Sequence, residues 1–403
     1  MATRLRRCIV LGPAGVISPE SPQDYRTGSN RFWLRDTRTR WVRLWADWPS
    51  LMPSPDQLDP AHIGALDAQI ARARADRMRI ILTAYRFPRW ANGTATMTPA
   101  QLAATMPDRR SAGQPDARAK SLEFRYPDDL SPTGPFGGFL RLLIERYGRP
   151  APTNAPVDAL EVCNEPNLQW WPQQGPSATP DPYGRGSIVV DDAVARMFIT
   201  AKQIADDAGR DIILAGPGSA DLTASNRLRT GYHSLGDRVL ASLAEAGVVP
   251  GPGFAWTHHN YADVTYDQGP GSTAPDAATN GARQTNLAAD MRSRLVGRWA
   301  GWPDADVANP QLLLTEGGAT LASMRARYGL SDPAEQRRKQ AELIARNWDR
   351  MASDSGDGAG IAMTAQYLLY SDAIFDSGLC EPKDAGGATR PSYEVWKGLP
   401  SFR

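Results

Sequence analysis

The chain has 403 residues, of which 41% are hydrophobic and 22% are charged, and its formal net charge is +1. This length suits two average domains or one α/β barrel, and the near-zero charge predicts no nucleic acid or anionic membrane as a partner. No run approaches the roughly 18 apolar residues that span a bilayer. The apolar part of segment 1–17 is short and broken by Gly and Pro, so no signal peptide is expected. A cytoplasmic location is favoured, and secretion with a trimmed leader stays open.

Three widely spaced cysteines, Cys8, Cys163 and Cys380, predict neither a disulfide framework nor a CxxC metal site. Cys8 and Cys163 lie inside apolar runs, which is typical of buried, inert thiols.

Eight short apolar runs follow one another along the chain. They are nearly continuous rather than alternating, which is typical of strands buried on both faces of a parallel sheet. The runs span residues 8–12, 41–48, 79–85, 159–166, 211–218, 254–261, 311–318 and 361–370.

Amphipathic helical segments precede most of these runs, and alternation of helix with strand predicts a parallel sheet. Eight such units favour closure into a (β/α)8 barrel, with residues 1–403 as a single domain. An open doubly wound sheet is the alternative, but the segment after the first run, GPAGVIS, is a poor match to a GxGxxG phosphate turn. The predicted helices span residues 61–77, 136–147, 190–208, 237–246, 285–299 and 333–351.

Long loops follow runs three to six, at residues 86–135, 167–186, 219–236 and 262–282. Long loops without regular structure usually carry function, and in an α/β barrel these loops lie on the face that holds the active site.

Two carboxylates close apolar runs, Glu165 in LEVCNEPN and Glu316 in LLLTEGG. The end of a buried strand is a costly place for a charge unless the charge is paired or functional. Because parallel strands of a barrel end at one mouth, we expect the two side chains to face a shared substrate.

The motif Asn164-Glu165-Pro166 on the fourth run resembles the Asn-Glu-Pro motif of glycoside hydrolase clan A, the retaining (β/α)8-barrel glycosidases that include cellulases, β-mannanases and β-xylosidases. Glu316 on the seventh run is similar to the nucleophile position of that clan. Arg43 on the second run and His259-Asn260-Tyr261 on the sixth also match clan positions, and segments 88–90 and 390–393 resemble the β-xylosidase-like branch.

The resemblance implies a retaining glycoside hydrolase with Glu165 as acid/base and Glu316 as nucleophile. Arg43 would keep Glu316 ionised, and Tyr261 would donate a hydrogen bond to it. Asn164 would bind the 2-hydroxyl of the sugar, and His259 would orient either a hydroxyl or a carboxylate. His258 points to the opposite face of the strand and is expected to be structural.

Aromatic residues of the long loops, Trp90, Trp170 and Trp171, are expected to stack on sugar rings. Alternatively, Trp170 and Trp171 pack their loop onto the barrel. The eighth run departs from the clan, whose members usually carry a tryptophan at its end. This chain has Gln366 and Tyr367 there, which we expect to contact the substrate.

Three other functions remain as alternatives. A transglycosidase would use the same two glutamates, and a sugar-binding barrel without activity would usually lack one of them. A metal-dependent hydrolase is disfavoured because the first run contains no paired histidines. The expected partner is a carbohydrate or glycoside, cleaved from chain ends or as a small molecule, with no cofactor and no metal.

Overall fold

The computed structural model describes residues 5–12, 24–98, 100–101, 123–150, 155–168, 171, 189–221, 231–248, 253–265, 311–352, 361–372 and 375–400. Its eight strands are parallel, pair in chain order and close into a barrel where β8 meets β1. The predicted (β/α)8 barrel is therefore confirmed, and the open sheet is excluded. The strands are β1 (Arg6–Val10), β2 (Trp41–Asp47), β3 (Arg79–Tyr85), β4 (Ala159–Glu161), β5 (Ile213–Ser219), β6 (Phe254–His259), β7 (Gln311–Glu316) and β8 (Ile361–Tyr367).

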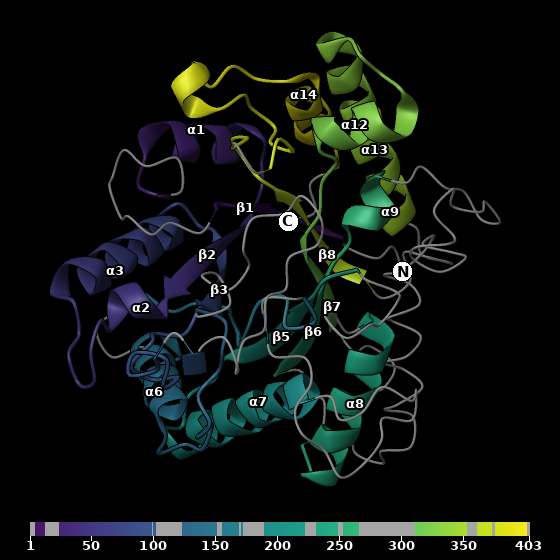
Figure 1. Ribbon diagram of the computed structural model, residues 1–403. Helices are drawn as coiled ribbons and strands as arrows, with labels where there is room; N and C mark the ends of the chain where they lie inside the picture. The colour runs from purple at the N-terminus through teal and green to yellow at the C-terminus, as the bar shows by residue number, and fades with distance from the viewer. Residues whose placement is uncertain are drawn as a thin grey trace.

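Helices surround the strands on the outside of the barrel (Figure 1). Four predicted helices match within two residues at each end, and α8 begins five residues before its predicted start. The predicted helix at 285–299 lies outside the described residues. The helices are α1 (Gly28–Asp36), α2 (Trp48–Leu51), α3 (Pro60–Ala75), α6 (Pro135–Tyr147), α7 (Val189–Asp207), α8 (Tyr232–Glu245), α9 (Tyr261–Thr265), α12 (Leu321–Tyr328), α13 (Pro333–Ala352) and α14 (Pro391–Gly398), with a 3-10 turn η2 (Lys383–Ala385).

Several strands are shorter than the apolar runs that predicted them. The fourth run extends to residue 166, but β4 ends at Glu161, and the sixth run extends to 261, where α9 already begins. After Glu161 the chain no longer pairs with the sheet, and Glu165 adopts a left-handed backbone conformation with φ 48°. Such a conformation costs roughly 1–2 kcal/mol for a residue with a side chain and is concentrated at functional sites.

The barrel interior is apolar at the N-terminal ends of the strands and polar towards their C-terminal ends. Cys8, Ile81 and Leu313 belong to the buried apolar cluster inside the barrel. Because side chains alternate along a strand, the next inward position on β3 is Thr83 and the next on β7 is Thr315. These two hydroxyls belong to the hydrogen-bond network that supports the site described below.

A larger apolar cluster fills the space between the strands and the helices. In it, Trp48, the first residue of α2, stacks on Phe139 of α6, with ring centroids 4.8 Å apart and planes 5° apart. Cys8, Cys163 and Cys380 are buried and free, as their apolar settings predict for the first two. None of the helices in the described part of the chain is long and apolar enough to cross a membrane.

Candidate active site

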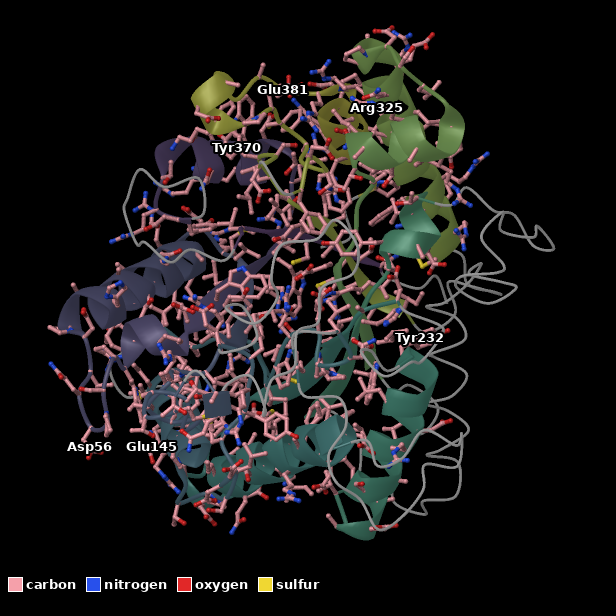
Figure 2. All side chains as sticks on the ribbon, viewed as in Figure 1. Asp56, Glu145, Tyr232, Arg325, Tyr370 and Glu381 are labelled. Carbon is pink, nitrogen blue, oxygen red and sulfur yellow. The ribbon has the colours of Figure 1, made fainter. Side chains whose placement is uncertain are left out.

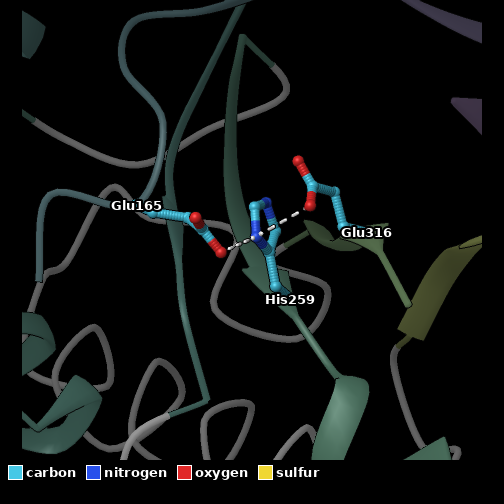
Figure 3. A group of neighbouring side chains, drawn as sticks. All are labelled: Glu165, His259 and Glu316. Atoms are coloured by element: carbon cyan, nitrogen blue, oxygen red, sulfur yellow. Dashed lines mark hydrogen bonds and ion pairs between the residues drawn. The ribbon is translucent and has the colours of Figure 1, made fainter. Parts of the chain in front are cut away.

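Three side chains from different strands meet at the C-terminal edge of the barrel. Glu165 follows β4, His259 ends β6 and Glu316 ends β7. Figure 3 shows the imidazole of His259 between the two carboxylates. Its Nδ1 lies 2.9 Å from Oε1 of Glu165 and 3.5 Å from Oε2 of Glu316. One oxygen of each carboxylate and this nitrogen all lie within 4.8 Å of one another.

Local backbone features aim these side chains at one another. A bulge between β6 and β7 pairs His259 with Glu316, after His258 has paired with Leu314. The bulge lets both Thr315 and Glu316 reach polar partners inside the barrel, as bulges re-aim side chains elsewhere. Glu165 is held by its own N–H, which donates to the carbonyl of Gly218 over 3.0 Å.

Both oxygens of Glu316 are bound by donors that the sequence predicted. Nη1 of Arg43 donates to Oε1 over 2.5 Å, and the hydroxyl of Tyr261 donates to Oε2 over 2.8 Å. Nη2 of Arg43 also donates to Oδ1 of Asn164 over 2.7 Å. This contact fixes the amide of Asn164 so that its NH2 group is the one available as a donor.

Burial and charge act against each other on these groups. Burial raises the pKa of Glu316 above its ordinary value, although the charges of His259 and Arg43 act to lower it. Burial alone would lower the pKa of His259, but Glu316 and the hydrogen bond to Glu165 outweigh it, so the pKa of His259 is raised. Burial and the nearby Glu316 raise the pKa of Tyr261, which keeps its hydroxyl protonated as a donor.

The sequence analysis did not identify Glu161, the last residue of β4, which is completely buried. Its carboxylate accepts from Nε of Arg43 over 2.8 Å and from the hydroxyls of Thr83 over 2.7 Å and Thr315 over 3.0 Å. Arg43 lowers its pKa although burial opposes this. A glutamate inside an apolar run was the available signal, because a charge there must have a buried partner.

Aromatic residues on two sides of the site were also largely missed. On the β2–β3 side, the rings of Trp45 and Tyr85 meet edge to face with centroids 4.8 Å apart, and the guanidinium of Arg43 lies 4.2 Å from the ring centre of Trp45. On the opposite side, the ring of Tyr367, predicted to contact substrate, lies 6.2 Å from Tyr261 and 5.2 Å from Phe375. Two-residue periodicity from Arg43 and Thr83 would have placed Trp45 and Tyr85 on the inward face.

Two predicted substrate contacts are corrected by the structure. Gln366 is buried, and its Nε2 donates to the carbonyls of Tyr367 over 3.0 Å and Ser377 over 2.7 Å, so it holds the segment after β8. Trp171 is only 2% exposed and packs against Phe87, with ring centroids 5.3 Å apart. This placement agrees with the alternative that the tryptophan packs its loop onto the barrel.

The other predicted aromatic contacts have different positions. Trp90 is partly buried, and its indole N–H donates to the carbonyl of Met52 over 3.0 Å. Trp170 lies outside the described residues. Tyr370, a residue after β8 that is not among the predicted contacts, lies towards α1, where its hydroxyl accepts from the indole N–H of Trp33 over 3.0 Å (Figure 2). His258 contacts the hydroxyl of Ser219 over 2.9 Å and is fully buried, which fits its expected structural role.

The geometry of Glu165, His259 and Glu316 favours hydrogen bonds over a tetrahedral zinc ion. Two ligands of one zinc ion, each about 2.1 Å from it, lie about 3.4 Å apart in tetrahedral geometry. His259 and Glu165 are closer than that, at 2.9 Å. The guanidinium of Arg43, 2.5 Å from Glu316, already supplies a positive charge that a second cation would have to oppose.

The (β/α)8 fold of this chain is shared with solved structures of glycoside hydrolases. A family 39 glycoside hydrolase from Bacteroides cellulosilyticus WH2 is 14% identical with a TM-score of 0.52 over 98% of this chain, which spans only 63% of that protein. GH5_18 from Streptomyces cattleya, solved with GlcNAc, is 16% identical with a TM-score of 0.52 over 100% of this chain and 83% of its own.

A third structure, endo-glycoceramidase II from Rhodococcus sp. in a cellobiose-like imidazole complex, is 13% identical with a TM-score of 0.54. The similarity covers 98% of this chain and 78% of that one. In sequence, no protein-family model and no curated protein matches the chain.

Proposed function

We propose that this protein is a retaining glycoside hydrolase in which Glu316 is the nucleophile and Glu165 the acid/base. The observation that supports this most strongly is the separation of the two carboxylates, whose facing oxygens lie within 4.8 Å of each other. Retaining enzymes hold their carboxyl groups about 5–5.5 Å apart, whereas inverting enzymes need roughly 6.5–9.5 Å to admit a water molecule.

The surroundings of each glutamate suit its proposed role. Glu316 is the more buried, and donors on both of its oxygens favour the carboxylate form that attacks the anomeric carbon. The side chain of Glu165 is 24% exposed, which lets it reach the leaving group. The hydrogen bond between Glu165 and His259 holds Glu165 towards Glu316 and the position of the scissile bond.

In the first step, Glu316 forms a bond to the anomeric carbon while the glycosidic bond breaks and its oxygen takes the proton of Glu165. In the second, ionised Glu165 removes a proton from water, the water oxygen bonds to the same carbon and Glu316 is released. Asn164 supplies a donor for the 2-hydroxyl, and the Trp45–Tyr85 and Tyr367–Phe375 pairs bound the sugar ring. The lengths of chain between β3 and α6 and between β4 and α7 favour small glycosides or chain ends as substrates.

The test is a panel of nitrophenyl glycosides of both anomeric configurations, with wild type, Glu316→Ala and Glu145→Ala. Glu145 lies on the outer surface of α6 and controls for the loss of a glutamate. We expect Glu316→Ala to lose several orders of magnitude in turnover, with azide restoring part of it as the inverted glycosyl azide. Proton NMR of the first wild-type product should show the anomeric configuration of the substrate. An inverted first product, or full activity of Glu316→Ala, would refute the proposal.

A further inference from the structure

Glu161 sits beneath the two proposed catalytic glutamates and contacts neither of them. It is 0% exposed, and it is bound by donors from several strands: Arg43 from β2, Thr83 from β3 and Thr315 from β7. Each of these contacts delivers a hydrogen to its oxygens. Glu161 is therefore held as a charged acceptor inside the barrel, where an unpaired charge would be very costly.

The guanidinium of Arg43 joins Glu161 to Glu316. Its Nε and Nη2 face Glu161, and its Nη1 donates to Oε1 of Glu316. Because a guanidinium is planar and rigid, fixing two of its nitrogens on one carboxylate also fixes the direction of the third. The position of Arg43 relative to Glu316 is thus set from below, by Glu161.

We propose that Glu161 is a positioning residue of the active site, which aims the guanidinium of Arg43 at Glu316 and takes up part of its positive charge. The effect on turnover rests on the proposed function, whereas the effect on the charge state of Glu316 does not. Gly218 supports the arrangement, because a Cβ at this residue would lie 3.1 Å from Oε1 of Glu161 and its φ of 59° is left-handed.

The direction of the effect follows from the charges. If Glu161 loses its charge, the positive charge of Arg43 is no longer shared, so the pKa of Glu316 should fall. A carboxylate held more tightly by Arg43 is also a weaker nucleophile. Besides Arg43, the titratable groups that face Glu316 are the same in a Glu161 variant as in wild type. They are Tyr85, Glu165, His259, Tyr261 and Tyr367.

The experiment compares Glu161→Gln with Asp158→Asn. Asp158 lies just before β4 and is likewise a buried carboxylate paired with arginines, Arg74, Arg79 and Arg149, but at the opposite end of the barrel. Both variants should lower the melting temperature. The titration of Glu316 is followed by NMR of protein labelled with carbon-13 at the glutamate carboxyls, and its signal is assigned by its loss in Glu316→Gln.

In Glu161→Gln we expect the titration midpoint of Glu316 to move to lower pH by about half a unit or more, and kcat to fall about tenfold or more with little change in KM. Asp158→Asn should leave the midpoint and kcat as in wild type. Glu161→Asp keeps the negative charge but holds it farther from Arg43. It should therefore lower kcat, with a smaller shift of the Glu316 midpoint than in Glu161→Gln. If Glu161→Gln does not fold, Glu161→Asp is used in its place. An unchanged midpoint in Glu161→Gln, or wild-type kcat in Glu161→Asp, would overturn the inference.

The experiment distinguishes failure of the proposed glycoside hydrolase function from failure of the role proposed for Glu161. If wild type cleaved no glycoside, the NMR titration would still decide whether Glu161 controls Glu316. If wild type cleaved glycosides and the Glu316 midpoint did not move in Glu161→Gln, only the role proposed for Glu161 would be refuted.

Discussion

The hydroxyl of Tyr261 donates to Oε2 of Glu316 over 2.8 Å, on the side of the carboxylate opposite Arg43. The donor is the first residue of α9 and lies two residues after the end of β6, so the strand-to-helix turn sets its position. Its pKa is raised by burial and by Glu316, which keeps the hydrogen on the tyrosine. The proposed nucleophile is therefore held between a permanent cation and a neutral donor.

Removing this hydroxyl should slow catalysis without unfolding the protein. A hydrogen bond to a charged group contributes about 1.5–3 kcal/mol, so Tyr261→Phe should lower kcat by roughly ten- to a hundredfold. Tyr328→Phe is the matched control, because its hydroxyl makes a bond of the same length, 2.8 Å, to the carbonyl of Thr265 outside the site. Steady-state kinetics of the two variants would separate them, and equal losses would count against a special role for Tyr261.

Glu165→Ala should show a dependence on the leaving group. Dinitrophenyl glycosides depart without a proton, so the variant should cleave them far better than substrates with poor leaving groups. Glu394→Ala, a change on the outer helix α14, should leave this dependence as in wild type. The measurement is kcat/KM across a series of aryl glycosides. A uniform loss across the series would mean that Glu165 does not protonate the glycosidic oxygen.

Asp221, just after β5, should make stability depend on pH. Partial burial raises its pKa from 3.8 to about 7, against the hydrogen bond from the N–H of Ala262. Between these values the folded protein holds a proton that the unfolded chain releases, so this contribution to stability is present at pH 4 and is lost as the pH rises through 7.

Asp221→Asn keeps the acceptor for Ala262 and removes the titration. It should therefore raise the melting temperature at pH 8, and the gain should vanish near pH 4. Asp206→Asn, on the exposed face of α7, controls for the loss of one negative charge. A gain that is the same at both pH values would contradict the assignment.

Gly317, directly after Glu316, leaves no room for a side chain. A Cβ there would lie 2.3 Å from Oδ1 of Asn260, whereas a Cβ on Gly64 in α3 would meet nothing within 4 Å. Gly317→Ala should lower the free energy of unfolding by roughly 1–3 kcal/mol. Gly64→Ala should raise it by up to about 1 kcal/mol, because alanine favours the helix. Urea unfolding measures both, and a stable Gly317→Ala variant would show that Asn260 can move aside.

The sequence was sufficient for the barrel and for the residues at its mouth. Eight apolar runs predicted the strands, and Glu165, His259 and Glu316 came together because parallel strands end at one edge. Glu161 could not be recognised as a strand end, because it lies inside the apolar run 159–166, whereas β4 ends at this residue. Period two along β8 would have turned Gln366 away from the interior, since Ala365 and Tyr367 face inwards.

Loop aromatics could not be placed in this way. A tryptophan next to a long loop gains free energy both by stacking on a sugar and by joining a core, and only the packing partners decide between the two. For Trp171 these partners are Phe87, Phe124 and Tyr126, which come from the loop after β3. No periodicity in the sequence relates them to residue 171.

The ion network inside the barrel makes the proposed activity depend on closure of the whole barrel. Arg43 and Thr83 come from the first half of the chain and Thr315 and Glu316 from the second, and they meet around Glu161 only when the strands have closed. A fragment with β1–β4 alone would contain Arg43 and Glu161 without the proposed nucleophile, and one with β5–β8 would contain Glu316 without its cation. Neither half-barrel would be an enzyme by itself, so activity regained on mixing two such fragments would report that the ring had been rejoined.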